Sequence, residues 1–396
     1  MFEYFPNNYV WNLALNIALN SGARMGEVDE VSRPLLDIAS QGADAGTAAF
    51  LTAWSGLAER LIGLAKEDEA RGRLLSAGEK YGRASTYLIT AERLQRQGAS
   101  GREAAYRTML DCFARSMRLG GEPSERVEVP YEGKSLACWF YPSQAVAHAP
   151  APCMIFVNGL DSTKEMIYRS GFAQALARRG VSTLMVDQPG VGVALRLHGL
   201  AAVPQAERWA SVLVDHLQGR PDVRPDRIGI MGWSLGGFYA PRAAAFEPRL
   251  QCCVAWGANY NWGELQKRRL AREGSNPVPH YWEHVQWVWG AKSMEEFMAL
   301  TPSINLEGVL HRIRMPTLVT HGSNDRQIPV EYAHRTFDEL VNSSKRELKI
   351  YTAQDGGIEH VSIDAQDNAR DYIADWVSEV LAGGHVMEGA STLPKP

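Results

Sequence analysis

The sequence of 396 residues predicts a mostly parallel eight-stranded sheet flanked by helices, preceded by a separate helical region. Apolar residues recur at three- and four-residue spacing over residues 8–119, which is the period of amphipathic helices. After residue 126, short apolar runs alternate with helical segments, which is typical of a parallel sheet with helices on both faces. The segment 119–123, with two glycines and a proline, separates the two patterns.

The first pattern predicts an N-terminal helical domain over residues 1–123. Its clearest helices are expected at 48–70 and 71–97. Four asparagines at every fourth position fall on one stripe of an earlier helix: Asn8, Asn12, Asn16 and Asn20.

The second pattern predicts a catalytic domain over residues 124–386, followed by a loose tail at 387–396. Its strands are expected at 127–131, 135–141, 153–158, 181–187, 227–231, 251–256, 315–321 and 346–352. Its helices are expected at 163–179, 201–218, 235–247, 330–342 and 364–382. The segment of about 257–314 is too long for a simple crossover, so it predicts a helical lid insertion after strand six.

Composition excludes several classes of protein. The chain has 41 Lys and Arg against 45 Asp and Glu, which argues against nucleic-acid binding. No run of 18 apolar residues and no secretory signal pattern is visible, so we expect no membrane span and a cytoplasmic location. The five cysteines show no CxxC spacing, which argues against a disulfide or zinc framework. We expect no metal and no other cofactor.

The segment from Gly232 to Gly236 matches the pattern G-x-S-x-G. A predicted strand leads into it and a small-residue helix leads out of it. This strand–turn–helix context predicts a nucleophile elbow with Ser234 at the tip of a strained turn. The turn requires small residues two positions before and after the serine, and both positions are glycine.

A nucleophilic serine needs a histidine base and a carboxylate that orients the base. Asp325 follows the seventh predicted strand, and His360 lies on the loop after the eighth. The order Ser234, Asp325, His360 is the order expected after an elbow of this kind. His321 precedes the acid and is expected to be a packed or loop histidine, and Glu359 is expected to be a solvated neighbour of the base.

A tetrahedral oxyanion needs two backbone N–H donors. Leu235, directly after the nucleophile, should supply one, and Leu160 in the loop after strand 153–158 should supply the other. Asp161, in the same loop, is a candidate substrate-binding residue. The segment 187–192 lacks dinucleotide-binding spacing and is expected to be a tight turn beside the site.

Aromatic residues gather near the nucleophile. Six of the 11 tryptophans lie between residues 233 and 289. They favour a bulky, flat, apolar-faced substrate, with Trp256 expected to pack the core. The candidate substrate-binding residues here are Trp233, Trp262, Tyr281 and, as a pocket acid or a surface carboxylate, Glu264. His280 to His284 match H-x-x-E-H, which leaves open a zinc-peptidase helix or an amphipathic lid helix.

These motifs resemble the α/β-hydrolase superfamily. The closest likeness is to a subgroup of 2,6-dihydroxypseudooxynicotine hydrolase, fungal polyketide-shortening hydrolases and fermentation–respiration switch-type esterases. The likeness rests on the runs NGLDSTKE at 158–165, DQPGVG at 187–192, GWSLGGFYA at 232–240, EPRL at 247–250 and AWG at 255–257.

The resemblance implies Ser234, Asp325 and His360 as a catalytic triad. It also implies hydrolysis of a carbon–carbon bond between a carbonyl and an electron-rich aromatic ring, in an aromatic or polyketide-like small molecule. A homodimer with the active site between the helical region and the sheet is typical of the subgroup, and its extra acidic residue corresponds to Glu264. A carboxylesterase or lactonase, and an acyltransferase or cyclase with the same acyl-serine, stay open as alternatives.

Overall fold

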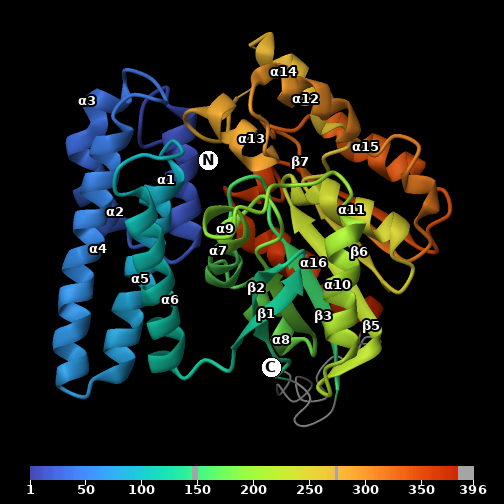
Figure 1. The fold of residues 1–396 in the computed structure, drawn as a ribbon, viewed down its shortest axis with the longest axis horizontal. Coiled ribbons are helices and arrows are strands. Elements are labelled where there is room, and N and C mark those ends of the chain that lie inside the picture. The colour runs from blue at the N-terminus through green and yellow to red at the C-terminus, as the bar shows by residue number, and fades with distance from the viewer. Residues whose placement is uncertain (145–149, 273–274, 382–396) are drawn as a thin grey trace, which may run out of the picture. The chain divides into compact units, whose positions relative to one another are not determined.

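A computed structural model describes residues 1–144, 150–272 and 275–381, and the chain forms two compact units (Figure 1). The helical unit comprises Met1–Ser124 and Lys267–Ala299, and the sheet unit comprises Glu125–Gln266 and Leu300–Pro396. The predicted tail at 387–396 lies outside the described residues.

The sheet unit confirms the predicted strands. In its described part, eight strands form one sheet in the order β1-β2-β4-β3-β5-β6-β7-β8. Only the β1–β2 and β2–β4 pairs are antiparallel, and the other pairs are parallel. The strands are β1 (Glu125–Tyr131), β2 (Lys134–Tyr141), β3 (Ala151–Val157), β4 (Ser182–Val186), β5 (Val223–Trp233), β6 (Cys253–Trp256), β7 (Thr317–Gly322) and β8 (Arg346–Tyr351).

Helices flank this sheet, with α8 packed on α16 and α10 packed on α11. The helix predicted at 163–179 is in fact two helices, because Gly171 between them has a φ of +76°, which ends the first. The helices are α7 (Lys164–Arg169), α8 (Phe172–Arg178), α9 (Gly192–Arg196), α10 (Glu207–Gln218), α11 (Gly236–Phe246), α15 (Val330–Glu339) and α16 (Gln366–Leu381).

The insertion predicted after strand six is helical, as expected. It contains α12 (Trp262–Leu270), α13 (Tyr281–Trp289) and α14 (Met294–Leu300), followed by single turns at Thr301–Ser303 and Leu310–Arg312. Residues 267–299 of this segment pack as part of the helical unit.

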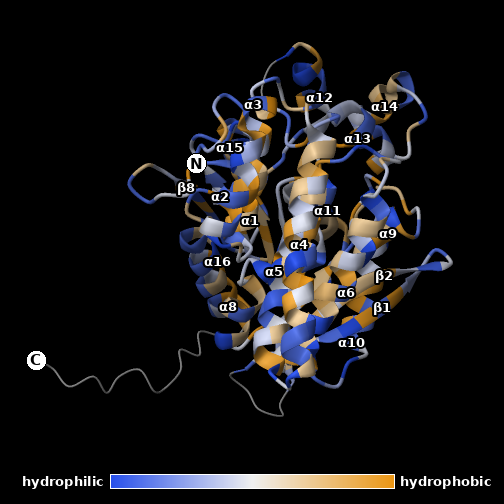
Figure 2. Ribbon diagram, turned by 90° about the vertical axis from the view of Figure 1, so that its left-hand side faces the viewer, coloured by the Kyte–Doolittle hydropathy of each residue, from blue (hydrophilic) through white to orange (hydrophobic). Residues whose placement is uncertain are grey.

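The rest of the helical unit is also helical, and apolar and polar residues are interspersed along α4, α5 and α6 in Figure 2. Its helices are α1 (Tyr9–Asn20), α2 (Met25–Ser32), α3 (Leu36–Ala39), α4 (Thr47–Ala70), α5 (Leu74–Arg93) and α6 (Arg102–Gly120), with a single turn at Arg33–Leu35.

The asparagine stripe of α1 holds the chain that precedes this helix. The Asn12 side chain accepts the N–H groups of Tyr4 and Phe5 at 2.8 Å and donates to the Phe5 carbonyl at 2.8 Å. Asn16 pairs in the same way with the backbone of Phe2. Asn12 and Asn16 are buried, so this stripe satisfies backbone groups that would otherwise lack partners.

The strand order places a topological switch point between β3 and β5. The chain leaves β3 toward β4 on one side and then crosses to β5 on the other side of β3. Loops at the carboxyl ends of two such strands diverge and leave a crevice, where open α/β sheets bind their ligands. The loop after β3 and the predicted nucleophile after β5 both follow strands that flank this switch point.

The five cysteines are free and buried; Cys253 begins β6, and Cys252 directly precedes it. No helix within residues 1–144, 150–272 or 275–381 combines the length and apolar character that a membrane crossing requires.

Candidate functional site

The predicted elbow follows β5. Ser234 has a φ of +57°, a conformation that is uncommon for residues other than glycine. Its N–H donates to the Trp256 carbonyl at 2.9 Å, which fixes the turn to the end of β6. A Cβ atom on Gly232 would lie 2.5 Å from the Gly236 carbonyl oxygen, so the turn can close only with glycine at position 232.

The structure brings Ser234, His360 and Asp325 together. His360 Nε2 lies 2.9 Å from Ser234 Oγ, and His360 Nδ1 lies 2.8 Å from Asp325 Oδ2. A carboxylate only accepts hydrogen bonds, so Nδ1 carries the proton and Nε2 of the neutral ring accepts from the serine hydroxyl. This is the arrangement in which a serine can lose its proton to a histidine as it attacks.

Asp325 is held as an anion in a buried position. Burial alone would raise the pKa of Asp325. The attraction to His360 when that ring is protonated, together with the hydrogen bond from His360, outweighs burial and lowers the pKa below its ordinary value. The other oxygen, Oδ1, accepts the N–H groups of Gln327 at 2.8 Å and Ile328 at 3.0 Å. His321 is buried, and its Nε2 lies 2.9 Å from the Ile328 carbonyl and 3.5 Å from Asp325 Oδ2.

The loop that carries His360 is fixed by a carboxylate that the sequence analysis missed. Asp364 accepts three successive backbone N–H groups, from Gly357, Ile358 and Glu359, at 2.8–3.1 Å. The signal in the sequence was weak, because an acid shortly before a helix is common.

The expectation that Glu359 is solvated is wrong. This side chain is buried, and it accepts from Asn324 Nδ2 at 3.1 Å and Arg326 Nε at 3.4 Å. It therefore ties the loop of the predicted base to the loop of the predicted acid.

Both predicted oxyanion donors are available. Among the described residues, no acceptor takes the backbone N–H of Leu160 or of Leu235. The two loops are in contact, because a Cβ atom on Gly159 would lie 3.0 Å from Ser234 Cβ. A buried pair of free N–H groups beside a nucleophile can stabilise the negative charge of a tetrahedral intermediate.

The predicted substrate-binding residues lie in different surroundings. Trp233 is only 7% exposed, its indole N–H donates to Ser162 Oγ, and its ring packs on Phe156 and Trp256. Trp256 is buried in the core, as expected, and Trp262 is also buried. Glu264, two residues after Trp262, is exposed and accepts from the Tyr332 hydroxyl at 2.7 Å.

Asp161 is half-buried in the loop after β3. Tyr281 belongs to the helical unit, where its hydroxyl accepts from Arg269. Substrate contact by Asp161, Trp233, Trp262, Glu264 and Tyr281 stays a prediction.

Only the second histidine of H-x-x-E-H lies within a helix. His280 caps α13 with a φ of +50°, and its Nε2 contacts Thr47 Oγ1 at 3.3 Å, whereas His284 lies inside the helix. Within the described residues, no group of three or more His, Cys, Asp or Glu side chains is placed to hold a metal ion.

Two known protein families match the sequence of this chain. A family model described as esterase FrsA-like matches residues 53–262, just over half of the chain. The chain belongs to the FrsA-like esterase family. A second model, of the prolyl oligopeptidase family, matches residues 210–384.

Individual relatives of this FrsA-like protein agree with the family. It is 29% identical to 2,6-dihydropseudooxynicotine hydrolase of Paenarthrobacter nicotinovorans, with 84% of each chain covered. It is 31% identical to alpha/beta hydrolase psoB of Aspergillus fumigatus, over 77% of this chain and 76% of that one. The crystal structure of the 2,6-dihydroxy-pseudo-oxynicotine hydrolase matches with a TM-score of 0.76 and 25% identity, covering 93% and 96% of the two chains.

These findings confirm the fold class and the resemblance predicted from the sequence. The FrsA-like protein is a hydrolase with the α/β-hydrolase fold.

Proposed function

We propose that this protein is a serine-nucleophile hydrolase with Ser234, His360 and Asp325 as its catalytic triad. The observation that carries the proposal is the continuous relay from Ser234 Oγ through His360 to Asp325, with contacts of 2.9 and 2.8 Å. The free N–H groups of Leu160 and Leu235 support it, because they supply the second requirement of acyl transfer.

In the proposed reaction, Ser234 Oγ attacks the substrate carbonyl carbon while its proton passes to His360 Nε2. The Leu160 and Leu235 amides stabilise the oxyanion. The intermediate collapses, the bond to the leaving group breaks, and His360 returns the proton to that group. Water then adds to the acyl-serine with His360 as base, which releases a carboxylic acid and restores the Ser234 hydroxyl.

We propose carbon–carbon cleavage beside the carbonyl of an aromatic ketone, 1,3-diketone or polyketide-type compound. The likeness to 2,6-dihydropseudooxynicotine hydrolase supports this class. The chemistry restricts the leaving group: it departs with the electron pair of a C–C bond, so it must be an enol or an electron-rich phenolic ring that accepts a proton on carbon.

A second candidate is a carboxylesterase or lactonase acting on a hydrophobic aromatic ester. The match to the esterase FrsA-like family favours it. The same residues serve both reactions, because the two pathways differ only in whether oxygen or carbon leaves.

A mass-spectrometric substrate panel tests both candidates. It compares acylated phloroglucinols and aryl 1,3-diketones with matched aryl esters, with Ser234→Ala as the control. We expect turnover of the carbon-linked substrates and loss of all turnover in Ser234→Ala. Turnover of esters alone would exclude the C–C reaction. Full activity of Ser234→Ala, or failure of a fluorophosphonate probe to label Ser234, would exclude the serine mechanism.

We also propose that residues 1–123 are a cap or dimerisation domain and that the protein acts as a homodimer in the cytoplasm. The resemblance supports the first two statements and the free buried cysteines the third. Sedimentation velocity of the full chain tests the dimer, and a monomer at micromolar concentration contradicts it.

A further inference from the structure

The segment 158–164, named here the oxyanion loop, is anchored at its start by Gln188. The Asn158 N–H donates to Gln188 Oε1 at 3.0 Å, and Gln188 Nε2 donates to the Asn158 carbonyl at 2.9 Å. Both side chains are buried. This two-way pair fixes the first residue of the loop to the chain that follows β4.

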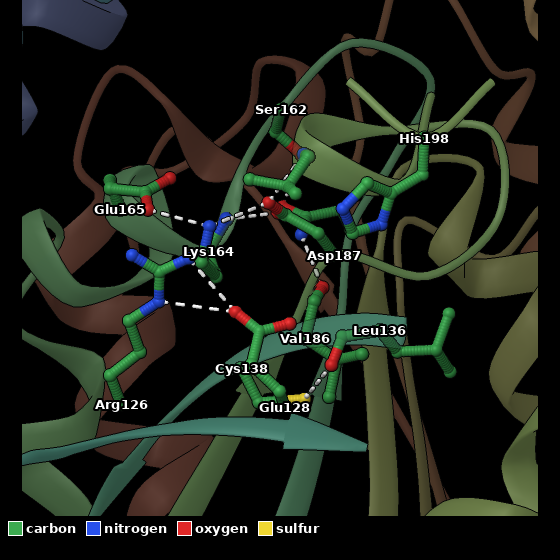
Figure 3. A network of polar contacts seen from close by, with 12 residues as sticks. Arg126, Glu128, Leu136, Cys138, Ser162, Lys164, Glu165, Val186, Asp187 and His198 are labelled. Atoms are coloured by element: carbon green, nitrogen blue, oxygen red, sulfur yellow. Dashed lines mark hydrogen bonds and ion pairs between the residues drawn. The ribbon is translucent and has the colours of Figure 1, made fainter. Parts of the chain in front are cut away.

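The end of the loop is anchored by a buried ion pair (Figure 3). Lys164 donates to the Asp187 carboxylate twice, from its backbone N–H at 2.8 Å and from Nζ at 2.7 Å. Nζ also pairs with Glu165 at 2.7 Å, and the charge of the Asp187 carboxylate helps to raise the pKa of Lys164 above its ordinary value although burial lowers it. The lysine is therefore a buried cation that holds the loop end, not a solvent-exposed residue.

Between the two anchors, one hydroxyl group closes the loop. Ser162 Oγ accepts the Gly159 N–H at 3.1 Å and the Trp233 indole N–H at 3.0 Å, and it donates to Asn158 Oδ1 at 2.7 Å. A serine hydroxyl has one proton to donate and two lone pairs to accept with. All three capacities of the buried Ser162 are used.

Two of these bonds close the oxyanion loop on itself, and the third connects it to the segment that carries the nucleophile. The bond from Gly159 to Ser162 spans three residues, so Leu160 lies at the tip of a tight turn. The bond from Trp233 comes from the residue directly before Ser234. Loss of the hydroxyl would release the turn that presents the Leu160 N–H, and would release it from the strand that presents Ser234.

We infer that Ser162 is a positioning residue that sets the Leu160 N–H against Ser234 for oxyanion stabilisation. This inference rests on the proposed serine mechanism. A purely structural role for the hydroxyl would lower stability and leave the turnover number of the folded enzyme unchanged. A positioning role lowers the turnover number, because the donor is needed more in the transition state than in the bound substrate.

The test compares Ser162→Ala with Ser170→Ala in the full chain. Ser170 is a matched control in the same region: its hydroxyl donates to the Ile167 carbonyl at 2.7 Å and takes no part in the oxyanion loop. Three quantities are measured: kcat and KM for an aryl ester, the rate of Ser234 labelling by a fluorophosphonate, and the thermal midpoint. The labelling reaction also forms a charged oxygen at the attacked centre, and it needs no natural substrate.

For Ser162→Ala we expect kcat and the labelling rate to fall about 10- to 100-fold, below the loss reported for removing a donor outright. KM should stay within about twofold, because ground-state binding does not use the oxyanion donors. Ser170→Ala should keep wild-type values for both rates. Wild-type kcat and labelling in Ser162→Ala, or loss of stability alone, would overturn the inference.

Two further variants keep the test decisive if Ser162→Ala does not fold. Trp233→Phe removes one of the three bonds and keeps a smaller aromatic ring, and Ser162→Cys keeps a weak hydrogen-bonding group in place. Both should lower kcat by less than Ser162→Ala, and Ser162→Cys should leave KM within about twofold of wild type. Wild-type kcat in both variants overturns the inference. A failure of the serine mechanism itself appears differently, as a wild-type enzyme that the probe does not label.

Discussion

Buried polar side chains serve different purposes in the helical unit and in the sheet unit. In the helical unit, Asn12 joins three backbone groups of the preceding chain, so its amide serves the fold. In the sheet unit, buried polar groups converge on Ser234, and two backbone N–H groups beside it, those of Leu160 and Leu235, have no acceptor among the described residues. Buried polar groups are nearly always paired. The comparison shows that the candidate active site is marked by two free N–H groups placed beside a nucleophile, and not by the burial of polar groups alone.

The largest expected effect breaks the relay in the sheet unit. Asp325→Asn leaves the shape intact but offers an amide where His360 Nδ1–H needs an anion, so the ring adopts the wrong tautomer. We expect kcat to fall by about 10⁴-fold, as in triads of this kind. Steady-state kinetics and probe labelling measure the loss.

Asp355→Asn is the matched control for this change, because its carboxylate lies 2.8 Å from Lys349 and outside the relay. Wild-type activity is expected there. A loss of less than tenfold in Asp325→Asn would show that Asp325 is not the acid.

The next largest effect is expected for Asp364→Asn, which should lower both the free energy of unfolding and kcat. Asp364→Asn removes the charge that holds three backbone N–H groups of the His360 loop and leaves an amide that can accept fewer of them. We expect a loss of about 2 kcal/mol in the free energy of unfolding. The freed loop should also lower kcat by about 10-fold, because His360 then spends less time aligned. Urea unfolding measures the loss of stability, and kinetics on the folded enzyme measure the loss of kcat. An unchanged kcat would show that Asp364 contributes to stability alone.

In the helical unit we expect a substitution of a buried polar residue to lower stability and to leave the reactivity of Ser234 unchanged. Asn12→Ala leaves the buried N–H groups of Tyr4 and Phe5 without an acceptor, at a cost of about 2 kcal/mol of stability. The labelling rate of Ser234 in the folded protein should stay within about twofold. Thr52→Ala, which removes an exposed hydroxyl bond on α4, should change stability by less than about 0.5 kcal/mol. A large loss of labelling in Asn12→Ala would contradict the division between the units.

Local sequence patterns were sufficient to predict the framework. Each of the eight strands was expected within a few residues of its position, because alternation of apolar runs and helices reports burial directly. The Ser234, Asp325 and His360 side chains meet as expected, since the carboxyl ends of parallel strands share one edge. The break at Gly171 was missed, because a glycine can continue a helix as well as end one.

The residues that hold the site in place could not be predicted. Gln188 pairs with Asn158 across 30 residues of chain, and Trp233 reaches Ser162 across 71. Such bonds depend on the register of neighbouring strands, which no local pattern encodes. The tryptophan count also predicted less than expected: Trp233, Trp256, Trp262 and Trp289 are all buried. Quenching of tryptophan fluorescence by a planar ligand would therefore report mainly on Trp282 and Trp287.

The smallest expected effect is on the pH dependence of stability, through His321, which lies beside Asp325. Burial lowers the pKa of His321, although the Asp325 carboxylate and the bond to the Ile328 carbonyl raise it. The folded pKa lies below the unfolded value of about 6.5, so the unfolded chain binds more protons as the pH falls through that value.

His321 therefore stabilises the fold fully above about pH 6.5 and progressively less below it, with a slope of at most about 1.4 kcal/mol per pH unit. His321→Gln keeps an N–H donor for the Ile328 carbonyl and removes the titration. The variant should show a flatter loss of stability between about pH 6.5 and 5 in urea unfolding. The kcat at neutral pH should change little, because His321 is neutral there. An unaltered pH slope would show that His321 is protonated to the same extent in the folded and unfolded chain.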